Sequence, residues 1–353
     1  MRILHVVGAR PNYMKVAPVH RALAGRADQF LVHSGQHYDE LMSAVFFDQL
    51  GIPPPDVNLE VGSATHAVQT AQVMMRLEPV LTAHRPDMVL VYGDVNSTLA
   101  GAIVSAKLGI PVGHVEAGLR SGDRRMPEEI NRVVTDAVAD LLFTPSDDGD
   151  ANLANEGVPA SKVHLVGNVM IDTLVRLLPL ADAAKARDAL GLSERYVLVT
   201  LHRPSNVDDP ETLRALLDVL DVIAQDVDVI FPVHPRTRAR IAGHASDSRV
   251  RFVDPLGYLE FLALQRQAAA VVTDSGGIQE ESTFLGIPCL TVRENTERPV
   301  TITLGTNVLV GQDPARLLAE TRRVLNGHRP EGRIPPLWDG CAAARIANVL
   351  LAR

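Results

Sequence analysis

Cysteine is scarce in this sequence. Its 353 residues include only two, Cys289 and Cys341, which form neither a disulfide framework nor a metal-ligand pattern. We therefore expect a reducing compartment, the cytoplasm, and a core that needs no disulfide. Hydrophobic residues make up 46% and charged residues 22%, values typical of globular proteins, so the chain can build a large core.

Signals for membranes and nucleic acids are also missing. No apolar run reaches the length of a membrane-spanning helix, and residues 1–7 are predicted to form a first strand rather than a signal peptide. The formal net charge is −8 and the pI is about 5.8, which argues against a general nucleic-acid surface. An anionic ligand would need a local cluster of basic side chains against this acidic background. We therefore expect neither a membrane nor a nucleic acid among its partners.

Three common active-site motifs are absent as well. The sequence contains no Walker A motif, no Gly-x-Gly-x-x-Gly and no His-Glu-x-x-His, so kinase, dinucleotide-oxidoreductase and zinc-protease functions lose their main support. His33 and His37 are four residues apart, but they flank a Ser-Gly-Gln turn, and no acidic residue has metal-ligand spacing to them. We expect no metal and no cofactor.

Strand-like and helix-like segments alternate along the whole chain, which predicts an α/β fold with parallel sheets and right-handed crossovers. Predicted strands fall in two series. The first comprises 2–7, 30–34, 88–92, 112–115, 141–144 and 162–166, and the second 196–201, 227–233, 250–253, 268–273 and 288–292. The main helices between them are predicted at 12–24, 39–50, 66–84, 97–108 and 128–139.

A mostly helical segment without a strand, 168–194, separates the two series. We place the domain junction near Gly167, which predicts domains at 1–167 and 168–337, each of a size that suits one Rossmann-like domain. Residues 338–353 have apolar side chains at helical spacing and are predicted to form a final helix, which could pack on the first domain.

One stretch of the second series, 271–299, combines a predicted strand, a glycine turn and a helix. Asp274, Ser275, Gly276 and Gly277 form the turn, where backbone N–H groups and the helix dipole can bind a phosphate. Glu280 or Glu281, just beyond the first helical turn, would then accept the hydroxyls of a ribose. The alternative is an ordinary strand-to-helix turn with two solvated glutamates, and the stretch by itself does not decide between them.

Charged or glycine-rich clusters follow nearly every predicted strand. Ligands of open α/β sheets bind beyond the carboxyl ends of the strands, so these clusters are expected to face one rim. The basic members are Arg10, Lys15, His202, Arg203, His234, Arg236 and Arg298. Each basic residue by itself is more often a surface charge, but Arg10 and His202 directly follow strands, which favours anion binding there.

The first series also carries three carboxylates of interest, Asp94, Glu116 and Glu128. For Glu128 alone, the better explanation is an acidic residue that stabilises a helix N-terminus, and Asp94 is equally explained as an N-cap. Glu116 lies at a strand end with no local helix to cap. Together the three suit proton transfer at a site where burial and like charge raise one pKa toward neutrality.

The clusters together resemble the non-hydrolysing UDP-N-acetylglucosamine 2-epimerases. The resemblance covers essentially the whole chain, in the right order. It rests on residues 8–11 (Gly-Ala-Arg-Pro), 93–98 (Gly-Asp-Val-Asn-Ser-Thr), 114–120 (His-Val-Glu-Ala-Gly-Leu-Arg), 127–132 (Pro-Glu-Glu-Ile-Asn-Arg), 202–203 (His-Arg), 274–281 (Asp-Ser-Gly-Gly-Ile-Gln-Glu-Glu) and 296–299 (Thr-Glu-Arg-Pro). It implies two Rossmann-like domains facing a central cleft in a GT-B-like arrangement, usually in a homodimer.

The resemblance also implies an activity and residue roles. Family members interconvert UDP-N-acetylglucosamine and UDP-N-acetylmannosamine by eliminating UDP to a 2-acetamidoglucal and adding it back. By resemblance, Asp94, Glu116 and Glu128 are the acid/base candidates, and 168–337 is the UDP-binding domain. The remaining matched positions would bind the nucleotide. Those at phosphate are Arg10, Lys15, His202, Ser275, Gly276, Gly277 and Arg298, and His202 is also grouped with the catalytic residues. Glu281 would bind the ribose and Phe261 would lie beside the uracil.

One departure concerns regulation. Many family members have Gln-His-Arg where this chain has Gln36, His37 and Tyr38, and these positions help to form an activating substrate site. The missing arginine leaves that site in doubt and keeps a modified substrate open, such as UDP-2,3-diacetamido-glucuronate. Three competing functions also stay open: a GT-B glycosyltransferase, a hydrolysing epimerase and a non-catalytic nucleotide-sugar sensor.

Overall fold

The computed structural model describes residues 1–35, 50–183, 185–233, 235–245 and 247–352. The chain forms two compact units. Unit 1 contains residues 1–173 and 336–353, and unit 2 contains residues 174–335. The division falls within helix α7 (Val169–Ala183). The domain limits 1–167 and 168–337 stay a prediction.

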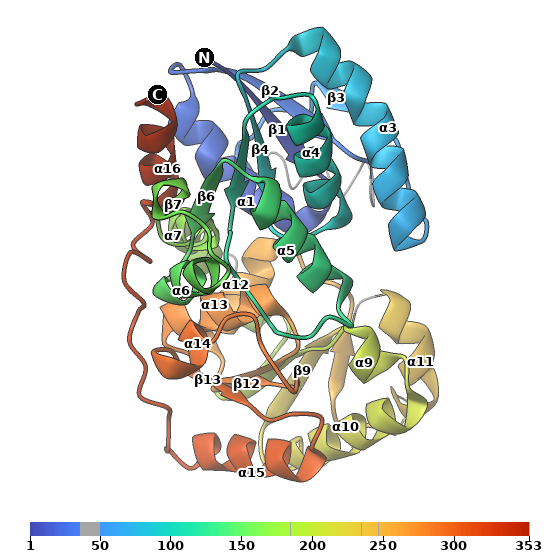
Figure 1. Ribbon diagram of the computed structural model, residues 1–353. Coiled ribbons are helices and arrows are strands. Elements are labelled where there is room, and N and C mark those ends of the chain that lie inside the picture. The colour runs from blue at the N-terminus through green and yellow to red at the C-terminus, as the bar shows by residue number, and fades with distance from the viewer. Residues whose placement is uncertain (36–49, 184, 234, 246, 353) are drawn as a thin grey trace. The chain divides into compact units, whose positions relative to one another are not determined.

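Unit 1 is built on a seven-stranded parallel sheet in the order β3-β2-β1-β4-β5-β6-β7 (Figure 1). Its strands are β1 (Arg2–Val7), β2 (Asp28–His33), β3 (Val57–Asn58), β4 (Met88–Tyr92), β5 (Val112–Val115), β6 (Leu141–Thr144) and β7 (Val163–Leu165). The order reverses direction between β1 and β4, and this switch point is where a Rossmann-like sheet binds its ligand.

Apart from α16 near the C-terminus, the described helices of unit 1 lie in the connections between its strands. They are α1 (Arg10–Leu23), α3 (His66–His84), α4 (Asn96–Lys107), α5 (Pro127–Val138), α6 (Asp147–Asn155), the short 3₁₀ helix Ala160–Lys162 and α16 (Ala342–Leu351). Helix α4 packs between α3 and α5, and α16 packs on α1. The apolar residues of β1 and β4 are buried, as expected for a sheet with helices on both faces.

Unit 2 has a six-stranded parallel sheet in the order β10-β9-β8-β11-β12-β13 (Figure 1). The strands are β8 (Tyr196–Thr200), β9 (Asp228–Pro232), β10 (Arg251–Val253), β11 (Ala270–Thr273), β12 (Cys289–Thr291) and β13 (Asn307–Leu309). Its helices are α8 (Ala186–Ala189), α9 (Pro204–Val207), α10 (Pro210–Ile223), α11 (Pro235–Ala245), α12 (Tyr258–Gln267), α13 (Gly276–Leu285), α14 (Val300–Thr303) and α15 (Pro314–Leu325), besides the end of α7. The switch point lies between β8 and β11.

The predicted α/β fold with two parallel, Rossmann-like sheets is confirmed. Every predicted strand is present with its ends within a few residues, and the segment 168–194 is helical and strand-free apart from residue 184 and the turns around α8. The strands β3 and β13, of two and three residues, were not predicted. The predicted helix 39–50 lies largely outside the described residues. Among those that are described, no helix is long and apolar enough to span a membrane.

Candidate active site

The turns that follow β4 and β5 bring Asp94 and Glu116 to the switch point of unit 1. Gly93 connects them: a Cβ atom on Gly93 would lie 3.2 Å from Glu116 Oε2 and 2.5 Å from Lys15 Nζ. Gly93 also adopts φ +65°, a left-handed conformation that favours glycine. The sequence therefore places glycine where the backbone must approach a charged pair closely.

Lys15, from the second turn of α1, forms that pair with Glu116. Both side chains are almost completely buried, and the ammonium group contacts Glu116 Oε2. Each of these two buried charged groups therefore has an oppositely charged partner, without which its burial would be strongly unfavourable. The resemblance assigned Lys15 to a phosphate; in unit 1 it contacts a carboxylate.

Glu116 has an unusual backbone. Its φ is +77°, a left-handed conformation that costs a non-glycine residue on the order of 1–3 kcal/mol and often occurs at functional sites. The amides of Glu116 and Ala117 both donate to the carbonyl of Phe143, at 3.0 Å each. Gly118 follows with φ +80°, and a Cβ atom there would lie 2.5 Å from the carbonyl oxygen of Gly149. The turn is therefore strained and tightly packed.

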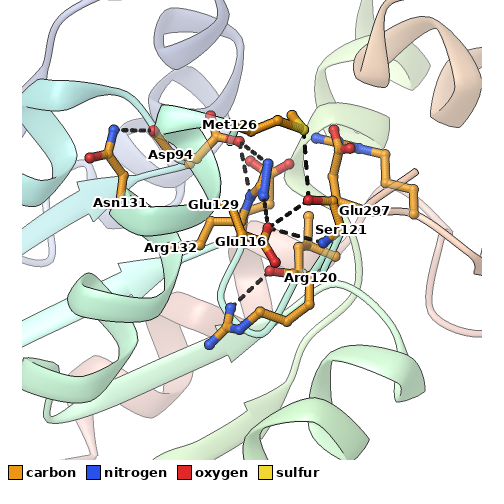
Figure 2. A network of polar contacts seen from close by, with 12 residues as sticks. Asp94, Glu116, Arg120, Ser121, Met126, Glu129, Asn131, Arg132 and Glu297 are labelled. Carbon is orange, nitrogen blue, oxygen red and sulfur yellow. Dashed lines mark hydrogen bonds and ion pairs between the residues drawn. The ribbon is translucent and has the colours of Figure 1, made fainter. Parts of the chain in front are cut away.

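Asp94 is held by helix α5 (Figure 2). Arg132 Nη2 lies 3.1 Å from Asp94 Oδ2, and the Asn131 amide donates to the Asp94 carbonyl at 2.8 Å. Arg132 also pairs with Glu129, whose carboxylate accepts the amide protons of Ser121 and Gly122 at 3.0 and 2.8 Å. Burial opposes ionisation of Glu129, but these hydrogen bonds and Arg132 lower its pKa. The arrangement links the turn after β4 to the first turns of α5.

Glu128 lies beside this network, half-buried in the first turn of α5. The helix dipole there stabilises its negative charge, as the alternative explanation required. Its neighbour Glu129 is the glutamate that anchors the loop before the helix. Helix α5 therefore places Glu128 next to the network around Asp94. Glu129 belongs to that network, because it pairs with Arg132 and accepts hydrogen bonds from Ser121 and Gly122.

In unit 2, Asp274 organises the turn that follows β8. Its carboxylate is completely buried and accepts hydrogen bonds from the backbone amides of His202 and Arg203 at 3.0 and 2.9 Å, and from the Asn206 side chain at 3.0 Å. His202 Nδ1 lies 2.9 Å from Asp274 Oδ1. Burial opposes ionisation, but these contacts lower the pKa of Asp274. The contact between Nδ1 and Asp274 orients the exposed His202 ring, so that Nε2 points away from the carboxylate.

The glycine turn itself starts helix α13. Ser275 is the half-buried N-cap residue, and its hydroxyl makes no capping hydrogen bond to the helix. The first turn therefore keeps N–H groups for an anion. A Cβ atom on Gly276 would lie 2.4 Å from Arg298 Nη1, so glycine at this position lets the guanidinium approach the N-terminus of the helix. Gly277 follows in the same turn.

Arg298 is nearly buried, and it pairs with Glu280 at 2.8 Å and with Glu297. Glu281 is also buried, and Tyr258 donates a hydrogen bond to its Oε1 at 2.9 Å. Burial raises the pKa of Glu281 to about 7, opposed by the Tyr258 hydrogen bond and reinforced by the charge of Glu280. The alternative of two solvated glutamates is therefore wrong.

The remaining predicted positions are only partly described. Phe261 is half-buried in the first turn of α12. The backbone of Arg10 begins α1, but its side chain lies outside the described structure, as does that of Arg236. His234 and the three residues of the doubtful regulatory site, 36–38, also lie outside the described residues.

Sequence reasoning missed the residues that hold these groups in place. Arg132 and Asn131 belong to a matched motif but had no predicted role, and Tyr258 was only a neighbour of Phe261. The available signal was the spacing of Arg132 and Asp136, which are four residues apart and therefore share one face of α5. Both are buried in the structure.

Comparison with known proteins identifies the relatives of this chain. A family model described as UDP-N-acetylglucosamine 2-epimerase matches residues 21–351. The chain is 40% identical to the UDP-N-acetylglucosamine 2-epimerase of Methanococcus maripaludis, over 98% of this chain and 97% of that protein. It is 43% identical to the UDP-2,3-diacetamido-2,3-dideoxy-D-glucuronate 2-epimerase of Pseudomonas aeruginosa, over 99% of both.

A solved structure of the same family is also similar to this chain. The UDP-GlcNAc 2-epimerase of Methanocaldococcus jannaschii, in complex with UDP-GlcNAc and UDP, matches with a TM-score of 0.93 and 40% identity, over 100% of both chains. This chain matches these relatives over nearly its whole length. It combines two parallel sheets, buried ion pairs of Glu116 and Glu129 in unit 1, and the Asp-Ser-Gly-Gly turn in unit 2. This chain belongs to the UDP-N-acetylglucosamine 2-epimerase family.

Proposed function

We propose that this enzyme interconverts UDP-N-acetylglucosamine and UDP-N-acetylmannosamine without releasing free sugar. The observation that carries the proposal is the division of chemistry between the two switch points. Unit 1 has Asp94 and Glu116 beside its reversal of strand order, and unit 2 has the glycine turn and Arg298 beside its own. Acid/base groups and a diphosphate site together are what the reaction needs.

The proposed reaction has two halves. In the first, a base removes the proton from carbon-2, the electrons of that bond form a double bond between carbon-1 and carbon-2, and UDP leaves with the electrons of its bond to carbon-1. In the second, carbon-2 of the 2-acetamidoglucal is protonated on the opposite face and a β-phosphate oxygen attacks carbon-1. Two faces of one carbon exchange protons, so at least two acid/base groups are required.

We assign these proton transfers to Asp94, Glu116 and Glu128, without ordering them. Glu116 is the central candidate, because Lys15 stabilises its carboxylate while the strained turn fixes its position. A proton arriving on Glu116 would weaken that ion pair.

Unit 2 would bind UDP and stabilise it as the leaving group. The Ser275 hydroxyl and the backbone N–H groups of Gly276 and Gly277, together with Arg298 and the oriented His202, would neutralise charge that grows on the diphosphate. Arg10 would add to them. Glu281 would accept the ribose hydroxyls, and Phe261 would lie against uracil.

A modified substrate is the second candidate. The Pseudomonas aeruginosa relative, 43% identical, carries a name for a diacetamido-glucuronate 2-epimerase, which makes this substrate a specific alternative. Both substrates share UDP and the acetamido group at carbon-2, so the chemistry proposed for the two switch points is the same. They differ at sugar carbons 3 and 6.

Exchange of the carbon-2 hydrogen tests the proposal. The protein is incubated with UDP-N-acetylglucosamine in deuterated water and the sugar is followed by NMR. We expect deuterium at carbon-2 in a nucleotide-linked sugar that divides between the two epimers. Free N-acetylmannosamine would indicate a hydrolysing enzyme, and absence of exchange would refute this substrate. Exchange seen only with the diacetamido-glucuronate would select the second candidate.

The variant Glu116→Gln tests the central assignment. Gln keeps the size of the side chain but does not accept a proton, so we expect no detectable turnover and a nearly unchanged affinity for UDP, which unit 2 binds. Calorimetric titration of UDP measures this affinity. Loss of UDP binding in a folded variant would contradict an acid/base role.

Three broader features belong to the same proposal. We propose that the enzyme acts in the cytoplasm as a homodimer and serves polysaccharide biosynthesis. We also propose that residues 1–167 and 168–337 correspond to the acid/base and UDP-binding domains. Sedimentation velocity with and without UDP tests the dimer, and a concentration-independent monomer would refute it.

A further inference from the structure

A completely buried histidine lies between the two turns that carry the carboxylates of unit 1. His114 is the third residue of β5 and has no solvent exposure. Its Nδ1 lies 2.6 Å from Asp136 Oδ1 of helix α5, and its Nε2 lies 2.8 Å from the carbonyl oxygen of Gly93. Both ring nitrogens are therefore engaged, each at a distance typical of a strong hydrogen bond.

Both partners of the ring are hydrogen-bond acceptors. A backbone carbonyl only accepts, so Nε2 must carry a proton to bind Gly93. The second oxygen of Asp136 accepts the amide proton of Gly118 at 3.0 Å and lies 2.8 Å from Arg120 Nη1, as expected of an ionised carboxylate. Burial disfavours that charge, but His114 and Arg120 outweigh it and lower the pKa of Asp136.

A ring rotated by half a turn does not offer an alternative. It would place carbon atoms at 2.6 and 2.8 Å from two oxygens, well inside the usual carbon–oxygen contact distance. The contacts therefore require a nitrogen at both positions, and the acceptors require a proton on both nitrogens. A histidine with both protons is positively charged.

The charges around Asp136 are consistent with a charged His114. Arg120 makes two hydrogen bonds of 2.8 Å to the carboxylate of Glu156, besides its contact with Asp136. Arg120 is thus one cation between two carboxylates. Glu156 is exposed to solvent, whereas Asp136 is buried, and a charged His114 gives Asp136 a second cationic partner. This matters because a buried charge is unfavourable without close partners.

We propose that His114 is an imidazolium and that the His114–Asp136 pair is a positioning device that fixes the turns bearing Asp94 and Glu116. The assignment of these turns to catalysis rests on the proposed function. The protonation of His114 does not, since it follows from contacts within unit 1.

Each member of the pair holds one turn. His114 Nε2–H fixes the carbonyl of Gly93, which belongs to the peptide group that joins Gly93 to Asp94. Asp136 fixes the amide of Gly118 and so ends the strained turn that begins at Glu116. Because the two members also bind each other, the distance between the two turns is set by one rigid link.

Helix α5 is the common support of this link. Asp136 lies four residues after Arg132, which binds Asp94, so the two residues share one face of the helix. Asp94 is thus held twice, at its side chain by Arg132 and at its peptide group by His114. A small shift of Asp136 would move both turns at once, and positioning errors of this kind are expensive in catalysis.

The charge is measured on the whole protein without any substrate. The protein is labelled with nitrogen-15 histidine, and two-bond proton–nitrogen spectra are recorded at about pH 7.5. His114 is assigned by the signal that disappears in His114→Gln, a variant that keeps an amide donor toward Gly93. We expect both ring nitrogens of His114 to be protonated. A single protonated nitrogen would overturn the proposal.

The positioning role is measured with Asp136→Asn, in which the amide can donate to Nδ1. We expect His114 to become neutral with its proton on Nε2, kcat to fall about 10²-fold, and KM and UDP affinity to stay within about twofold. The control Asp140→Asn changes a carboxylate that binds the amide of Val112 at the opposite end of β5, at 2.9 Å. It should keep both His114 protons and normal kcat.

The outcomes separate this proposal from the proposed function. An imidazolium signal in a protein that does not exchange carbon-2 hydrogen would leave the pair in place and refute the reaction. An active wild-type enzyme whose Asp136→Asn variant keeps its kcat would refute the positioning role. A variant in which kcat, KM and thermal stability all deteriorate together would also refute it, because that pattern marks a merely structural pair.

Discussion

Glu281 gives a stability prediction whose size follows from its surroundings. The glutamate is 2% exposed, and burial together with Glu280 raises its pKa from the ordinary value of 4.5 to about 7. A difference of about 2.5 pKa units corresponds to about 3 kcal/mol of unfolding free energy. The perturbation is Glu281→Gln, which keeps an acceptor for Tyr258 and removes the ionisation.

The direction follows from proton binding. The folded protein holds the Glu281 proton more tightly than the unfolded chain does, so unfolding releases it above the ordinary pKa of 4.5. The wild-type protein therefore loses stability as the pH rises from 4.5 to about 7, and the loss is complete above that. Between pH 5.5 and 8.5 the loss attributable to Glu281 is about 2 kcal/mol. The Gln variant lacks it.

The chain offers a convenient assay. Its single tryptophan, Trp338, is buried in unit 1 and donates a hydrogen bond to the Pro145 carbonyl, so tryptophan fluorescence follows that unit. Urea unfolding is followed by fluorescence and by circular dichroism, which reports both units. A circular-dichroism transition without a fluorescence change belongs to unit 2, where Glu281 lies.

The comparison of interest is the difference between variant and wild type. We expect the unfolding free energy of Glu281→Gln, relative to wild type, to increase by about 2 kcal/mol from pH 5.5 to 8.5. Glu194→Gln, at an exposed glutamate of the same unit, is the matched control and should leave the pH dependence unchanged. Equal pH dependence of wild type and Glu281→Gln would refute the reasoning.

Three further predictions concern other parts of the protein. Gly118 and Gly122 both have a left-handed φ, but a Cβ atom on Gly118 would lie 2.5 Å from the Gly149 carbonyl oxygen, whereas one on Gly122 would meet open space. Gly118→Ala should therefore destabilise the protein by about 1–3 kcal/mol more than Gly122→Ala in thermal or urea unfolding. Equal losses would contradict the importance of this contact. Arg298→Met leaves Glu280 buried without this partner, and we expect about 3–5 kcal/mol of lost stability together with weaker UDP binding; full stability would show that the pair is unimportant. Activity should survive EDTA, because side chains and backbone N–H groups are proposed to stabilise the diphosphate; loss that added magnesium restores would refute this.

The sequence predicted which candidate residues would lie at strand ends, and parallel sheets bring those ends to one rim. Alternating segments identified β4 and β5, and their adjacency brings Glu116 to Gly93, the neighbour of Asp94. The glycine turn at Ser275 was located in the same way. These features depend on local patterns and on topology, both of which are visible in the order of segments.

Partners from distant segments were beyond such reasoning. Lys15 pairs with Glu116, about a hundred residues away, because α1 packs beside β4, the neighbour of β5 in the sheet. The sequence analysis assigned Lys15 to a phosphate, by resemblance, and gave no sign of a carboxylate partner. The same limit applied to Glu280 and Glu281, whose different environments come from Arg298 and Tyr258.

His114 shows a second limit. A lone histidine in an apolar strand resembles an ordinary core residue, and only the positions of Asp136 and the Gly93 carbonyl reveal two acceptors around it. A protonation state is set by such neighbours. It is therefore a property of the folded structure rather than of a motif.

The most direct test of the account follows the bond between UDP and the sugar. UDP-N-acetylglucosamine is prepared with oxygen-18 in the position that bridges carbon-1 and the β-phosphorus, and phosphorus NMR follows the label during turnover. Elimination and re-addition predict that oxygen-18 moves into non-bridging positions of the β-phosphate at a rate comparable to epimerisation. Epimerisation with the label fixed in the bridge would contradict cleavage of this bond and with it the proposed mechanism.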